Sequence, residues 1–140
     1  IARIVELLES GKRVVAHASR GNKDPRMAST LRVFDKCASQ HRSKQQMVTE
    51  VLGAALGRIT RKVMDLSPIS RICFAGGDTA GIAAQHLDIE CLQLCHSLTP
   101  GAPLCRASAP GSPADGREFT FKGGQVGKED FFGLLLGTSA

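Results

Sequence analysis

Two glycines, an acid and a hydroxyl follow a short apolar segment in residues 72–81, which read ICFAGGDTAG. The apolar residues predict a strand, and the alanines after the acid predict that a helix begins there. In an open α/β sheet, ligands bind beyond the carboxyl ends of the strands, where a helix N-terminus offers free N–H groups. Gly76 and Gly77 would let the backbone approach a phosphate, and Asp78 or Thr79 could cap the helix. The stretch therefore indicates an anion site, although a plain tight turn explains these four residues equally well.

A second glycine cluster repeats this design in FKGGQVGKEDF, residues 121–131. Lys122 ends an extended apolar piece, Gly123 and Gly124 follow it, and a helix with two acids in its first turn is expected to begin near Lys128. Neither cluster has the spacing of the Walker loop or of the dinucleotide fingerprint. Two such strand-glycine-helix junctions in a small domain favour a phosphate-binding site that belongs to neither of these two families.

Two side chains at these junctions have types that suit phosphate chemistry. Lys122 could place a positive charge near phosphates, and Asp78 could hold Mg²⁺ directly or through water. A solvated strand end explains Lys122 about as well. His17 and Ser19, which follow an apolar segment earlier in the chain, could also touch a ligand, but His17 is more simply a near-core histidine.

The cysteines raise the alternative of a zinc site. Cys91, Cys95 and His96 lie close together in the sequence, and Cys105 follows them. The segment around them is predicted to be a strand, in which residues four apart are separated by about 13 Å, too far to share one tetrahedral ion. Five cysteines without a secretory signal indicate reduced thiols, and Cys73 is expected to be a small core residue.

Composition bounds the class of protein. The chain has 140 residues, of which 42% are hydrophobic, so a single domain is expected. A net charge of +5 suggests that the protein could bind nucleic acid. The chain has no Trp or Tyr, however, so few side chains could stack on bases. We therefore expect no nucleic-acid partner, no membrane span and a cytoplasmic location.

Hydrophobic periodicity predicts an alternation of helices and strands. Expected helices cover residues 2–10, 43–64, 80–86 and 128–136, and a loop covers 19–30. Expected strands cover residues 12–18, 71–75, 89–95, 104–108 and 118–122. This order predicts an α/β fold with a mostly parallel sheet flanked by helices, and an antiparallel, hairpin-like addition near the C-terminus.

Three motifs, in this order, carry a resemblance to a known family. FAGGDTAG, LTPGAPLCR and FTFKGGQVGKEDFF resemble the C-terminal nucleotide-binding domain of the four-carbon acid sugar kinase family, formerly catalogued as a domain of unknown function. The match is strong over residues 71–137. The resemblance implies ATP and Mg²⁺ as cofactors, and phosphorylation of a terminal hydroxyl on a threonate, an erythronate or an oxo-tetronate. It implies a catalytic role for Asp78 and places these residues around the nucleotide: Gly76, Gly77, Asp78, Thr79, Lys122, Gly123 and Gly124.

The chain also departs from the family pattern. Members carry an N-terminal domain for the sugar acid, and their nucleotide domain opens with a strand and a Gly-Ser turn that residues 1–140 lack. We therefore expect residues 1–140 to be the nucleotide-binding part of a longer protein, inactive as a kinase in isolation. A homo-oligomer is compatible with this sequence. The alternative is a non-catalytic module that binds a nucleotide or an anionic metabolite.

Overall fold

The computed structural model describes residues 1–19, 21, 23–35 and 43–137. Its helices are α1 (Ala2–Glu9), α2 (Pro25–Asp35), α3 (Lys44–Leu66), α4 (Gly77–Ala84) and α5 (Phe131–Gly137). Its strands are β1 (Arg71–Ala75), β2 (Cys91–Thr99), β3 (Ala102–Ser108) and β4 (Glu118–Lys122).

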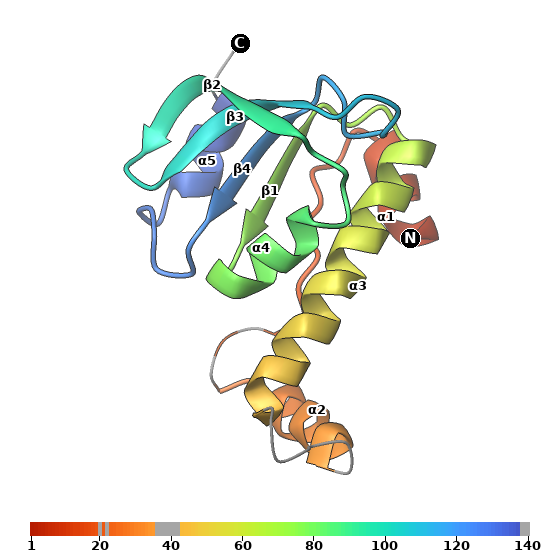
Figure 1. Ribbon diagram of the computed structural model, residues 1–140, viewed down its shortest axis with the longest axis vertical. Coiled ribbons are helices and arrows are strands. Elements are labelled where there is room, and N and C mark those ends of the chain that lie inside the picture. Colours follow the sequence, from red (N-terminus) through yellow and green to blue (C-terminus); the bar gives the residue numbers. More distant parts are fainter. Residues whose placement is uncertain (20, 22, 36–42, 138–140) are drawn as a thin grey trace.

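The strands form one mixed sheet in the order β1-β4-β3-β2 (Figure 1). β1 and β4 are parallel and in direct register, from Arg71 opposite Glu118 to Ala75 opposite Lys122. β3 pairs antiparallel with both β4 and β2. The predicted α/β fold and its antiparallel addition are confirmed, and the glycine clusters after β1 and β4 lie at the same edge of the sheet.

The expected strand at residues 12–18 is wrong. This segment forms no strand, and the side chain of Val15 is 72% exposed. A β-branched run forms a strand only where a neighbour supplies ladder hydrogen bonds and a face to pack on, and residues 12–18 receive neither. As a result, the antiparallel pairings in the described sheet outnumber the single parallel one.

The expected loop at residues 19–30 is only partly correct, because α2 begins at Pro25. Proline suits the first position of a helix, where an N–H group would have no partner. The buried carboxylate of Asp24 accepts a hydrogen bond from the backbone N–H of Arg26 at 3.0 Å, as an N-cap does. Asp-Pro therefore starts a helix here instead of forming a turn.

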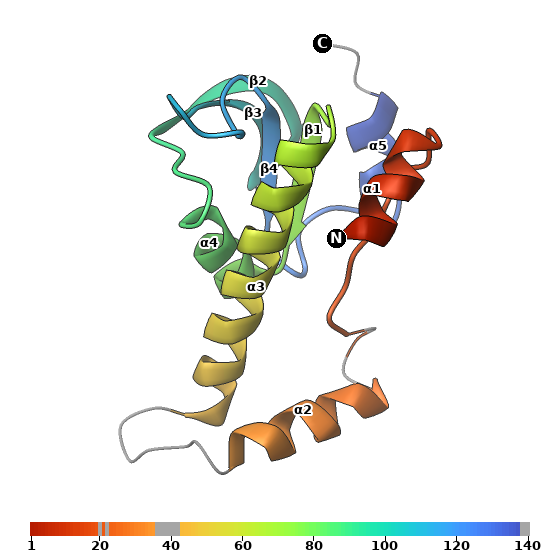
Figure 2. The same cartoon turned by 90° about the vertical axis from the view of Figure 1, so that its right-hand side faces the viewer.

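Helices cover both faces of the sheet (Figure 2). α3 and α4 lie on one face, and α1 and α5 lie on the other, while α2 packs against the N-terminal part of α3. The core lies between the sheet and the α3–α4 pair, and its most buried members include Ala83, Leu87 and Phe119. Residues 43–46 form a capping box that fixes the start of α3.

Candidate functional site

The first glycine junction connects β1 to α4 through an unusual backbone conformation. Gly76 has φ 128° and ψ 113°, a region that side-chain-bearing residues rarely adopt. Its N–H donates to the carbonyl oxygen of Lys122 at 2.9 Å, and its own carbonyl accepts from Ala80 N–H at 2.7 Å. Gly76 thus ties the end of β1 to the end of β4 and starts the helix at the same time.

The first turn of α4 presents open backbone to the exterior. The first hydrogen bond within α4 is donated by Ala80 N–H to the Gly76 carbonyl, so the N–H groups of Gly77, Asp78 and Thr79 have no acceptor within the helix and can donate to a ligand. The N-cap is Gly76 and no side chain caps the helix, so the expectation that Asp78 or Thr79 caps it is wrong: both lie within the first turn. A Cβ atom placed on Gly77 would meet no atom within 4 Å.

The second glycine junction follows β4. Lys122 is buried, with 8% of its surface exposed, and its Nζ donates to the carbonyl of Gly123 at 3.0 Å. The same Nζ lies 5.4 Å from the centroid of the Phe131 ring. Lys122 therefore holds its charge at the base of the glycine loop and fixes the loop backbone. Gly124 is exposed and has open space where a Cβ would lie.

The helix after this loop begins later than expected. α5 starts at Phe131, so Glu129 and Asp130 precede it and do not form its first turn. Gly127 has φ 90°, and a Cβ there would lie 2.8 Å from Cδ2 of Phe131. Position 127 therefore has no room for a side chain, and α5 begins three residues after the expected start at Lys128.

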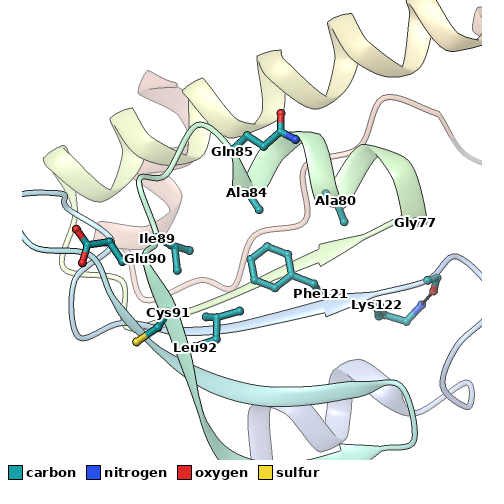
Figure 3. A pocket seen from close by; sticks show the side chains of 12 residues that line it. Gly77, Ala80, Ala84, Gln85, Ile89, Glu90, Cys91, Leu92, Phe121 and Lys122 are labelled. Carbon is teal, nitrogen blue, oxygen red and sulfur yellow. Dashed lines mark hydrogen bonds between the residues drawn. The ribbon is translucent and has the colours of Figure 1, made fainter.

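The structure contains a hollow that the sequence did not reveal. It has a volume of about 580 Å³ and lies between α4, the start of β2 and the exposed side of Phe121 (Figure 3). Gly77, Lys122 and Gly123 line one end of it, so both junctions open into one space. The small residues on α4 were the available signal, but they indicate a cavity only once the facing strand is known.

Four cysteines lie in the part of the chain that the structure describes, namely Cys73, Cys91, Cys95 and Cys105. β2 is a strand from Cys91 onward, as expected, and no group of three or more His, Cys, Asp or Glu residues in the described part of the chain could hold a metal ion. Burial raises the pKa of the Cys73 thiol to about 11, although the nearby charge of Lys122 partly offsets this. Cys73 is therefore a thiol, not a thiolate, at neutral pH. His17 is exposed, so the expectation that it is a near-core histidine is wrong, and a contact between His17 and a ligand stays a prediction.

Comparison with known proteins identifies the family. The family model for the nucleotide-binding C-terminal domain matches residues 1–132. This chain belongs to that family. The expected relationship to the four-carbon acid sugar kinases is thereby confirmed.

Two curated relatives are sugar-acid kinases. The chain is 33% identical over 135 residues to 3-oxo-isoapionate kinase of Paraburkholderia graminis, covering 96% of this chain and 28% of that protein. It is 36% identical over 101 residues to 3-oxo-tetronate kinase of Pseudomonas fluorescens, covering 69% of this chain and 22% of that protein. The chain thus spans less than a third of the length of either relative.

Solved structures show the same fold at low sequence identity. A protein from Bordetella bronchiseptica, described as a domain-swapped dimer with bound citrate, aligns with 94% of this chain and 36% of its own, with a TM-score of 0.52 and 20% identity. A putative tRNA synthase from Salmonella typhimurium aligns with 76% of this chain and 23% of its own, with a TM-score of 0.55 and 21% identity. In the described part of this chain, no helix is both long and apolar enough to cross a membrane.

Proposed function

We propose that this domain binds ATP with its phosphates at the paired glycine junctions. The observation that carries the proposal is the hydrogen bond between Gly76 N–H and the Lys122 carbonyl, which joins the two junctions at one sheet edge. Around it, the free N–H groups at the start of α4 and the open space over Gly77 and Gly124 suit close approach by phosphate oxygens. The family supports the same ligand class.

The residues present also fit the magnesium ion that accompanies ATP. The carboxylate of Asp78 lies exposed in the first turn of α4, and Mg²⁺ prefers oxygen ligands while keeping several waters. When bound, the ion would offset phosphate charge. Backbone N–H groups position the phosphates, and the buried Lys122 ammonium contributes positive potential at the loop.

We further propose that the longer protein phosphorylates the terminal hydroxyl of a four-carbon acid sugar of the threonate, erythronate or oxo-tetronate type. The two kinase relatives support the reaction class. Because a separate domain would hold the sugar acid, residues 1–140 alone should show no phosphorylation above background with labelled ATP and these acids. Rapid, sugar-dependent turnover by the isolated chain would contradict the proposal that a separate domain binds the sugar acid.

Nucleotide binding itself is tested by a thermal shift with saturating Mg-ATP. A ligand that binds only the folded state raises the melting temperature by mass action, so the wild-type chain should melt higher with ATP. Gly77→Val should remove the shift, because a branched side chain would occupy the space that phosphate needs. Gly133→Val is the matched control, since Gly133 is also a helical glycine with open space, on α5.

The shift should persist in the control variant. Equal shifts in both variants would show that Gly77 does not face the nucleotide, and no shift in the folded wild type at millimolar ATP would contradict binding altogether.

A further inference from the structure

Two cysteines lie at an irregularity in the ladder between β2 and β3. Leu94 pairs with Cys105, and the next pair is His96 with Leu104. At this point β2 has one extra residue, Cys95, so the strand contains a β-bulge. Cys95 therefore follows directly after the residue that pairs with Cys105.

The spacing of these two residues suits a covalent link between their thiols. Paired residues of antiparallel strands have Cα atoms about 5 Å apart, and one step along a strand adds about 3.3 Å at right angles. The Cα atoms of Cys95 and Cys105 are then about 6 Å apart, within the range of roughly 4.4–6.8 Å that is found in disulfides. Both residues are free thiols and are partly exposed.

The bulge also changes the direction of the side chains of β2. Side chains alternate between the two faces of a strand, and directly paired residues share a face. Leu94 and His96 are two residues apart, but they pair with successive residues of β3 and so lie on opposite faces. The alternation along β2 is therefore interrupted at Cys95. In a regular strand Cys95 would point to the face opposite Cys105, and the bulge removes this constraint.

The two thiols interact while they are reduced. Burial raises the pKa of the Cys105 thiol, and the charge of a Cys95 thiolate raises it further. Cys105 is therefore protonated at neutral pH and is a poor first nucleophile. The Sγ of Cys95 donates a hydrogen bond to the carbonyl oxygen of Gln93 at 3.7 Å. A thiol is a weak donor, so little is lost when this sulfur bonds to another sulfur instead.

The other described cysteines are poorly placed to pair with either thiol. Cys91 pairs with Ser108, three residues after Cys105, so Cys91 and Cys105 lie on opposite faces of the sheet. Cys91 is also about 13 Å from Cys95 along the same strand. Cys73 lies on β1, which β4 separates from β3.

We propose that Cys95 and Cys105 are a redox-active pair that forms a reversible disulfide, with a low-molecular-weight disulfide such as oxidised glutathione as the oxidant. The Cys95 thiolate attacks one sulfur of the oxidant and expels one thiolate, which leaves a mixed disulfide. Cys105 then loses its proton and attacks the sulfur of Cys95, which expels the second thiolate. Two protein thiols are oxidised, and one external disulfide is reduced to two thiols. The link joins the edge strand β2 to β3 and does not depend on nucleotide binding.

Mass spectrometry of the folded wild-type chain tests this pair. After incubation with oxidised glutathione, we expect the chain to lose two hydrogen atoms and to retain no glutathione. Chymotrypsin cleaves after leucine and so separates Cys95 from both Cys91 and Cys105. After alkylation of the remaining thiols and this digestion, the linked peptides should join Cys95 to Cys105. Dithiothreitol should restore both thiols.

A variant separates the two steps of the reaction. Cys105→Ala should stop it at the mixed disulfide, with one glutathione on Cys95, because no second thiol is present to release it. Cys91→Ala is the matched control on the same strand and should form the link as the wild type does. The proposal would be overturned by a link that includes another cysteine, by a mixed disulfide that persists in the wild type, by no adduct on Cys95 in Cys105→Ala, or by no reaction of either thiol in the folded chain.

Discussion

At the residue scale, adjacent glycines have different reasons to be glycine. Gly76 is required by its backbone, because φ 128° is strained for any other residue. Gly77 has no positive φ, and the space where its Cβ would lie is open. Its lack of a side chain therefore matters only to a ligand that approaches from solvent. The sequence predicts that both glycines belong to one site. It could not tell the backbone role of Gly76 from the ligand-facing role of Gly77, because the φ angle of Gly76 depends on how the end of β1 connects to the start of α4.

Cys73 gives a prediction that depends on pH. Burial holds the pKa of its thiol at about 11, above the value of 9.0 for an unperturbed thiol. The folded state therefore keeps the proton longer than the unfolded chain does, and this contribution to stability is complete below pH 9 and is lost as pH rises toward 11. The free energy of unfolding of the wild type should fall between pH 9 and 11 by on the order of 1 kcal/mol more than that of Cys73→Ala.

Denaturant titrations at pH 8, 9, 10 and 11 measure this difference. Cys91→Ala removes an exposed thiol and should follow the wild type. Parallel curves for the wild type and Cys73→Ala would mean that the Cys73 thiol titrates normally.

At the element scale, close packing of α3 on α4 positions the helix N-terminus. A Cβ on Gly57 would lie 2.5 Å from the carbonyl oxygen of Ala83, and one on Gly53 would lie 2.7 Å from Cβ of Ile82. The two helices can approach this closely only because both positions lack a side chain. The location of α4, and hence of its free N–H groups, depends on these contacts.

Gly57→Ala should therefore destabilise the domain. Forcing a methyl group against backbone typically costs about 1–3 kcal/mol, which outweighs the gain in helix propensity of about 1 kcal/mol. Gly81→Ala is the control, because a Cβ on Gly81 meets nothing within 4 Å and the variant gains only the propensity. Chemical denaturation measures both, and a Gly57→Ala variant as stable as the wild type would show that α3 and α4 separate easily.

Local patterns predicted most elements but not their partners. The strands at 71–75 and 118–122 and the long helix α3 follow from periodicity alone. Residues 12–18 have the same local character as those strands, but strand formation requires a neighbour, which no local pattern reports. The hollow could not be predicted for a similar reason. Ala84 and Leu92 line the same space only because α4 packs over the sheet.

At the scale of the whole molecule, sheet order brings the site together. The two glycine junctions lie more than 40 residues apart in sequence, and they meet because β1 and β4 are parallel neighbours that end at the same edge (Figure 1). Of the intervening strands, β2 contributes Cys91 and Leu92 to the wall of the hollow, and β2 and β3 together form the far part of the sheet. The candidate site therefore depends on the fold of the entire second half of the chain.

The most direct test of nucleotide binding at these junctions is a titration of the isotope-labelled chain with Mg-ATP, followed by backbone amide NMR. We expect saturable shifts centred on residues 76–79 and 122–124. Shifts confined to α2 and the N-terminal half of α3, or none at millimolar ATP in the folded chain, would contradict it.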